Sequence, residues 1–147
     1  MSSSQRLFVF AVVVSVLNVV AAVVASIFNW PAQFAGVGTD AGKEYLTRGT
    51  AISAPLLPAA LLLVVVWRAR DPGPSGRVAI IAAYLTALVV FTGGMGEAFA
   101  EPTEDVPKAV LVASGIGWTL IAAALVYLAR AAAVERRRAA TEANHDG

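Results

Sequence analysis

The residues of this sequence that could do chemistry are a few polar side chains within long apolar stretches. Asn18, Thr86, Trp118 and Thr119 each lie in a stretch without charged residues. At about 1.5 Å per helical residue, all four lie about 14 to 18 Å from a flanking arginine, near the middle of a hydrocarbon layer about 30 Å thick. An unpaired polar group there costs several kcal/mol, so Asn18 is expected to bond with one of the other three. The four residues form a candidate polar layer, which is either a small binding site or, as we favour, a set of hydrogen bonds between helices.

Glu97 is the most suggestive acidic residue, because it follows the sequence Gly-Gly-Met-Gly at the end of a predicted helix. It lies 20 residues after Arg77, or about 30 Å along a helix, which places it at the outer interface of a membrane. Facing the bundle, Glu97 would form an ion pair with Arg48 and could bind a proton or a cation. The alternative, which we favour, is a solvated charge at a helix end.

Most motifs of known chemistry are missing from the sequence. It has no Gly-rich phosphate loop, no nucleophile elbow and no HExxH zinc motif, and the absence of cysteine excludes thiolate chemistry. The predicted outer loops hold six acids and three bases, but the spacing of Glu101, Glu104 and Asp105 fits no calcium loop. We therefore expect no catalytic residue, no metal site and no cofactor, and favour a non-enzymatic protein.

The elements that position these residues are predicted from the distribution of charge. Charged residues make up 14% of the 147 residues, against roughly 25% in average globular proteins, and hydrophobic residues make up 58%. Four windows contain no Asp, Glu, Lys or Arg: residues 7–39, 49–67, 78–96 and 109–129. Each is long enough to cross about 30 Å of hydrocarbon as a helix. This composition excludes a soluble enzyme and a disordered chain, and a net charge of +1 argues against a nucleic-acid binder.

The predicted fold is all-α: one polytopic membrane domain over residues 1–147, a bundle of four transmembrane helices. The spans are expected at about residues 7–28, 50–67, 78–97 and 107–130, followed by a basic tail at 131–147. Pro55 and Pro58 predict a kink in the second span. One face of the first span carries small and polar residues that should point into the bundle: Ala11, Ser15, Asn18, Ala22, Ala25 and Asn29. In the fourth span, Ala113 and Gly117 form a pair suited to close helix packing.

The orientation is predicted from the basic residues that flank the spans. With both termini in the cytoplasm, the inside holds eight Lys and Arg residues and the outside three. This split follows the positive-inside rule, so the N-terminus and the C-terminus are both expected inside. Four inside arginines could also contact anionic lipid headgroups: Arg130, Arg136, Arg137 and Arg138. Arginine outnumbers lysine nine to two, which is typical of GC-rich bacterial genomes, so the plasma membrane of a bacterium is the expected location.

Three functions fit these observations. The favoured one is a structural or accessory protein of the bacterial inner membrane that associates with itself or with another membrane protein. The second is a small transporter or channel, and the third a DoxX-like enzyme acting on a lipid or quinone. The spans resemble those of small multidrug transporters and DoxX-like proteins in number and length, but the first span lacks the Glu of the former and no motif of the latter is matched. A sealed apolar core would favour the structural role, and a polar cavity reaching Asn18 would favour binding or transport.

Overall fold

The computed structural model describes residues 1–34, 39–71 and 73–143, and every regular element in these ranges is a helix. The helices are α1 (Ser3–Ile27), α2 (Ala41–Glu44), α3 (Leu56–Arg68), α4 (Pro74–Phe99) and α5 (Lys108–Ala143). Of these, α1, α4 and α5 are long and apolar enough to cross a membrane. The prediction of an all-helical chain with apolar spans is therefore confirmed for three helices, while α3 is shorter.

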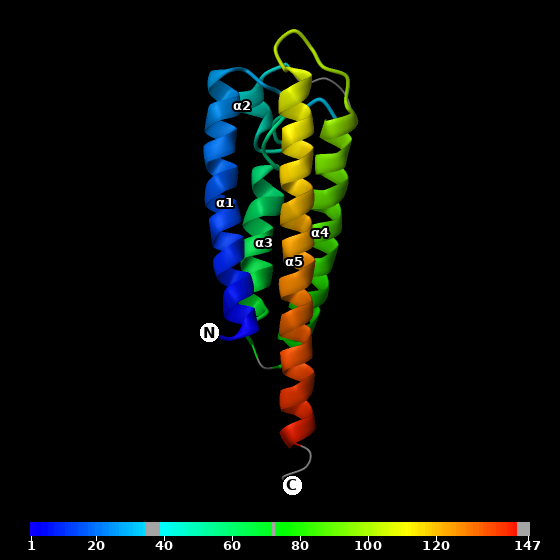
Figure 1. Cartoon of the computed structure of the whole chain (residues 1–147). Helices are drawn as coiled ribbons and strands as arrows, with labels where there is room; N and C mark the ends of the chain where they lie inside the picture. Colours follow the sequence, from blue (N-terminus) through cyan, green and yellow to red (C-terminus); the bar gives the residue numbers. More distant parts are fainter. Residues whose placement is uncertain (35–38, 72, 144–147) are drawn as a thin grey trace.

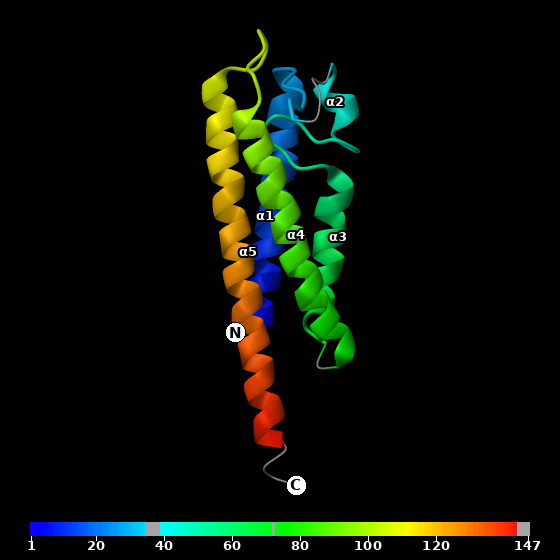
Figure 2. The same cartoon turned by 90° about the vertical axis from the view of Figure 1, so that its right-hand side faces the viewer.

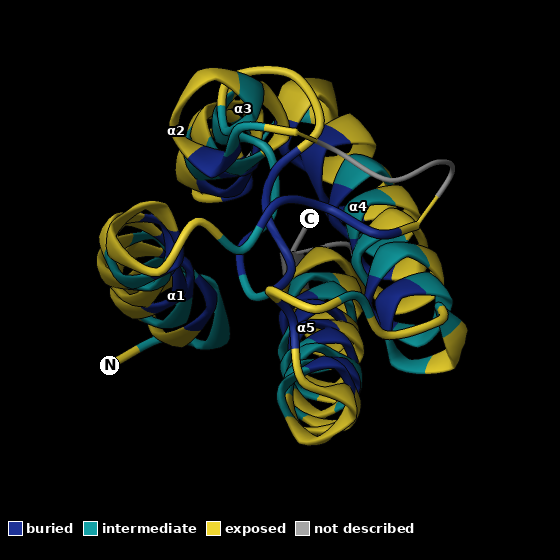
Figure 3. Cartoon of the chain, turned by 90° about the horizontal axis from the view of Figure 1, so that it is seen from above, coloured by how far each residue is buried: buried dark blue, intermediate teal, exposed yellow. Residues whose placement is uncertain are grey.

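The four larger helices lie side by side and form a ring (Figures 1 and 2). Seen from above, α1 and α4 occupy opposite corners, with α3 and α5 between them, and most exposed residues face outward (Figure 3). The start of α1 and the end of α5 lie at one end of the bundle, here called the terminal end. The connections that contain α2 and that join α4 to α5 lie at the other end, here called the loop end.

The predicted second span, residues 50–67, is helical only from Leu56 onward. Pro55 is the residue that precedes the helix, and Pro58 lies in its first turn, where a helix has no intrahelical partner for its N–H groups. The two prolines therefore mark the start of a helix instead of a kink within one. With 13 residues, α3 is about 20 Å long, too short to cross 30 Å of hydrocarbon.

The other three predicted spans are longer in the structure than the sequence indicated. The start of α1 is extended by a capping box, in which Ser2 and Gln5 exchange hydrogen bonds between side chain and backbone. The start of α4 is extended by Pro74 after Gly73. The last helix, α5, runs for 36 residues through most of the predicted basic tail, of which residues 144–147 lie outside the described range.

Small residues pack the helices together, although not always at the predicted positions. Of the residues predicted to face the bundle from the first span, four are buried: Ala11, Asn18, Ala22 and Ala25. Asn29 is exposed and follows the end of α1. The closest approach of α4 and α5 is made by Gly94 and Gly115, where an added Cβ would collide with the opposite helix. The predicted pair at Ala113 and Gly117 is wrong, because Ala113 is exposed and a Cβ at Gly117 would meet open space.

Two hydrophobic clusters fill the ends of the bundle. The larger one occupies the terminal half and contains buried residues from all four long elements, among them Leu7, Val66, Ile80 and Leu125. The smaller one lies at the loop end, where Ala51, Val106 and Leu111 are fully buried. Several buried polar side chains lie outside these two clusters, among them Asn18, Thr50, Ser53 and Glu97.

Candidate functional site

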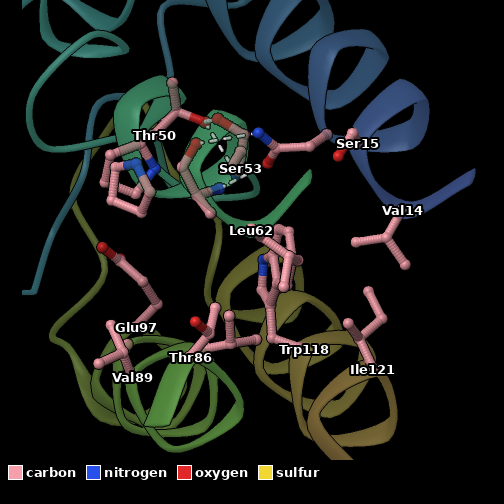
Figure 4. Close-up of a pocket in the computed structure, with 18 of the residues that line it drawn as sticks. Val14, Ser15, Thr50, Ser53, Leu62, Thr86, Val89, Glu97, Trp118 and Ile121 are labelled. Carbon is pink, nitrogen blue, oxygen red and sulfur yellow. Dashed lines mark hydrogen bonds between the residues drawn. The ribbon is translucent and has the colours of Figure 1, made fainter. Parts of the chain in front are cut away.

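A cavity of about 250 Å³ lies between the two hydrophobic clusters. Its wall contains residues of α1, α3, α4 and α5 as well as the segment before α3 (Figure 4). Apolar side chains dominate, and Leu62 and Leu125 of the larger cluster form part of the lining. The polar residues on the wall are Ser15, Asn18, Arg48, Thr50, Ser53, Thr86 and Glu97.

Residues 50–55, here called the break, replace the outer part of the predicted second span with non-helical backbone. Gly49 precedes them with φ +82°, a conformation in which a Cβ would collide with the Ser53 carbonyl. Residues 50–54 all donate their N–H groups: Thr50 to Ser53 O, Ala51 to Trp30 O, Ile52 and Ser53 to Thr50 Oγ1, and Ala54 to Asn18. The N–H groups of residues 50–54 are therefore all bonded within the protein, as non-helical backbone inside a membrane would require.

Asn18 holds the break to α1. Its Oδ1 accepts a hydrogen bond from Ala54 N at 2.7 Å, and its Nδ2 donates to Ala54 O at 3.1 Å and to the Tyr45 hydroxyl at 3.3 Å. The side chain is 2% exposed. The prediction that Asn18 bonds another member of the candidate polar layer is wrong, because its partners are the backbone of Ala54 and the hydroxyl of Tyr45. Burial raises the pKa of Tyr45 above its usual value, although the hydrogen bond from Asn18 opposes this effect.

Glu97 is buried, so the expected solvated charge at a helix end is wrong. Its carboxylate accepts N–H groups from the backbone of Gln33, at 3.0 and 3.1 Å, and of Phe34, at 3.1 Å. The Phe34 ring covers Gly96, where a Cβ would collide with it. Residues 30–34, here called the strap, thus join the end of α1 to the loop end of α4, and Glu97 fastens them there.

Arg48 lies on the wall of the same cavity as Glu97, but the ion pair that the structure shows for it is with Glu44, Nη1 to Oε2 at 4.0 Å. The side chain of Arg48 is 37% exposed, so this pair lies at the edge of the protein. Glu97 and Arg48 thus share one cavity wall, and the positive charge of Arg48 acts on the Glu97 carboxylate.

The remaining members of the candidate polar layer do not form one hydrogen-bonded group. Thr86 and Trp118 line the cavity with Asn18, and Figure 4 shows the Trp118 indole extending from α5 toward the middle of it. The Thr86 hydroxyl donates to Ala82 O of its own helix at 2.9 Å. Thr119 does not line this cavity, and its hydroxyl contacts Met95 Sδ at 3.5 Å.

The sequence interpretation missed the break and Tyr45. A signal for the break was present, because Gly49, two small hydroxyl residues and Pro55 interrupt an apolar window within seven residues. No comparable signal existed for Tyr45, since its contact with Asn18 joins residues 27 positions apart through a loop.

Comparisons with known proteins add no assignment to this geometry. No family model, curated protein or solved structure matches the chain.

Proposed function

We propose that this protein is an integral membrane protein that binds a small, partly polar molecule in the cavity between its helices. The observation that carries this proposal is the cavity itself, which reaches Asn18 and has polar side chains on an otherwise apolar wall. Concave, mostly apolar sites with a few polar groups are the usual form of small-molecule sites. A core that served only to hold helices together would be expected to close by packing.

The proposed setting is the plasma membrane of a bacterium, with both termini in the cytoplasm. In this arrangement α1, α4 and α5 cross the membrane, and α3 with the break before it forms the fourth element of the bundle. The charge-free stretches and the eight-to-three distribution of basic residues support this placement. The four arginines of α5 between Arg130 and Arg138 would then lie near the cytoplasmic headgroups.

The cavity retains hydrogen-bonding groups that the fold does not use. The Ser15 hydroxyl is buried without a partner, and Trp118 contributes an indole N–H for which the described residues supply no acceptor. The Thr86 oxygen can still accept a hydrogen bond after donating its proton to Ala82 O. A ligand with a carbonyl or hydroxyl group could therefore be oriented by a small number of contacts.

A structural or accessory role is the second candidate. It is favoured by Asn18 and Glu97, because the hydrogen bonds of both side chains hold parts of this chain together. A channel is less well supported than either role, because hydrophobic clusters occupy the bundle on both sides of the cavity.

Gly93→Leu tests the proposed function. Gly93 lines the cavity, and an added Cβ there has no atom within 4 Å, so leucine would fill the space without a collision at its first carbon. A panel of neutral and charged amphiphiles is compared by thermal unfolding in detergent. A bound compound at 100 times its Kd would stabilise the wild type by about 2.7 kcal/mol and leave Gly93→Leu unchanged.

Gly117→Leu is the matched control. It makes the same substitution within a helix, also into open space, but Gly117 does not line this cavity. Compounds that stabilise the wild type should stabilise this variant equally. Equal stabilisation of Gly93→Leu by every compound, or no stabilisation of any variant, would contradict the binding function and favour the structural role.

A further inference from the structure

The route into the cavity identifies the class of molecule that can reach it, and this inference rests on the proposed function. Along the axis of the bundle, packed segments lie on both sides of the cavity. The larger hydrophobic cluster lies on the terminal side, where Leu62 and Leu125 form its boundary. On the loop side lie the smaller cluster and the strap, which Glu97 fastens to α4.

Exposed lining residues point to an opening of the cavity at its side, between α3 and α4. Among its lining residues, Pro58 and Val89 are exposed, the latter by 63%, and one comes from each of these two helices. Both are apolar, so this opening would face hydrocarbon in a membrane. The other two exposed lining residues, Phe34 and Arg48, lie nearer the loop end, which would meet the membrane–water interface.

The charges around the opening do not favour a charged ligand. Arg48 is paired with Glu44, and Glu97 accepts the N–H groups of two residues, Gln33 and Phe34. The three ionised groups would sum to −1, which disfavours an anion, while a cation would have to share the Glu97 carboxylate with these two N–H groups. Deeper in the cavity, the groups that remain for a ligand are neutral: the Ser15 hydroxyl, the Thr86 oxygen and the Trp118 indole.

We propose that the ligand is a neutral, lipid-soluble molecule of one or two rings with a hydrogen-bonding oxygen, and that it enters from the bilayer between α3 and α4. The volume of about 250 Å³ exceeds the roughly 150 Å³ that suffices for benzene, so one substituted ring or two fused rings fit. The pyrrolidine rings of Pro55 and Pro58 and the flat indole of Trp118 give the wall compact apolar surfaces for such a molecule.

The test uses Trp118 as a reporter in vesicles of phosphatidylcholine. The chain has three tryptophans, so Trp30→Phe with Trp67→Phe leaves Trp118 alone. Three brominated probes of one ring quench its fluorescence on contact: neutral 4-bromophenol, anionic 4-bromobenzenesulfonate and cationic 4-bromobenzyltrimethylammonium. A protein that keeps only Trp67, which is 51% exposed, measures quenching by probe dissolved in the bilayer.

We expect 4-bromophenol to quench Trp118 with a saturable component that is absent at Trp67 and is removed by Gly93→Leu. The charged probes should need at least about tenfold higher concentration, because burial of an unpaired charge costs several kcal/mol. Equal saturation by a charged probe would overturn the lateral route and the neutral ligand, while the binding function would stand. Saturable quenching by no probe would instead count against the binding function.

Phosphatidylcholine with brominated acyl chains is the fourth arm of the experiment. If it quenches Trp118 and Gly93→Leu removes this quenching, a lipid chain is the occupant, which would overturn the ring-sized ligand.

Discussion

Asn18 and Glu97 act in the same way at two places in the molecule, because each side chain bonds backbone groups of a connecting segment. Asn18 bonds the N–H and C=O of Ala54, and Glu97 bonds the N–H groups of Gln33 and Phe34. Non-helical backbone that is buried away from water must find its hydrogen bonds within the protein. Asn18 and Glu97 each supply part of these bonds, which accounts for one polar side chain in each of two otherwise apolar helices.

Asn18→Leu is expected to destabilise the protein by about 1 to 3 kcal/mol, because it leaves both backbone groups of Ala54 without their partner. The measurement is reversible unfolding in detergent, followed by circular dichroism. Tyr45→Phe is the graded control: it removes only the contact at 3.3 Å and should cost less than about 1 kcal/mol. A stability of Asn18→Leu equal to that of the wild type would show that the break does not depend on this amide.

Glu97→Gln should release the strap from α4. An amide group offers one oxygen where the carboxylate offers two, and its NH₂ would face the N–H groups of Gln33 and Phe34 as a second donor. A loss of about 1 to 3 kcal/mol is expected from hydrogen bonds to a charged group, together with faster hydrogen exchange at these two amides. Glu101→Gln, at an exposed position just beyond α4, should change neither quantity. Unchanged exchange in Glu97→Gln would mean that the strap is held mainly by the Phe34 ring on Gly96.

At the scale of the elements, the long helices and the buried face of α1 could be predicted from the sequence, but the start of α3 could not. Charge-free windows identify α1, α4 and α5 because charged groups are costly in hydrocarbon, and small-residue spacing identifies the face of α1 that packs against the bundle. The same window test counts residues 50–55 as part of a span, since they are also uncharged. What separates them from α3 is a set of long-range hydrogen bonds to Asn18 and Trp30, which composition does not encode.

In the candidate site, the identity of most residues could be predicted from the sequence, but their hydrogen-bond partners could not. Five of the six predicted site residues line one cavity, and Thr119 does not; the five are Asn18, Thr86, Trp118, Glu97 and Arg48. Their bonds were not predictable, because the partners are backbone groups of the strap and the break. Depth along a helix is local information, whereas the fold of a connecting segment depends on contacts between distant residues.

Gly115→Leu is expected to disrupt the packing of α4 against α5. The Cβ of any larger residue would collide with Ala98 and would lie close to the Gly94 carbonyl, so the two helices would have to separate. Overpacking of this kind costs about 1 to 3 kcal/mol. Gly117→Leu places the same side chain two residues further along α5 into open space and should leave the unfolding temperature nearly unchanged. If both variants unfold alike, the close approach at Gly94 and Gly115 does not contribute to stability.

At the scale of the whole molecule, the buried polar groups of the cavity extend from Asn18 of α1 to Glu97 near the loop end of α4. The terminal half is filled by the larger cluster and the loop end by the smaller one, and the cavity lies between them. A molecule in the cavity would therefore exchange through the side of the bundle and not along its axis. This arrangement suits a binding protein within a membrane better than a pore.

The orientation in the membrane gives the last prediction, which rests on the eight-to-three split of basic residues. The chain has no cysteine, so single cysteines can be introduced at three exposed positions: Ser75, Glu101 and Thr141. In intact cells, a membrane-impermeant maleimide should label Glu101→Cys, because the proposed orientation puts the connection between α4 and α5 outside. Ser75→Cys and Thr141→Cys should react only after permeabilisation, since the same orientation puts the start of α4 and the end of α5 inside. Labelling of Ser75→Cys from outside would reverse the orientation, and equal labelling of Ser75→Cys and Glu101→Cys would mean that α4 does not cross the membrane.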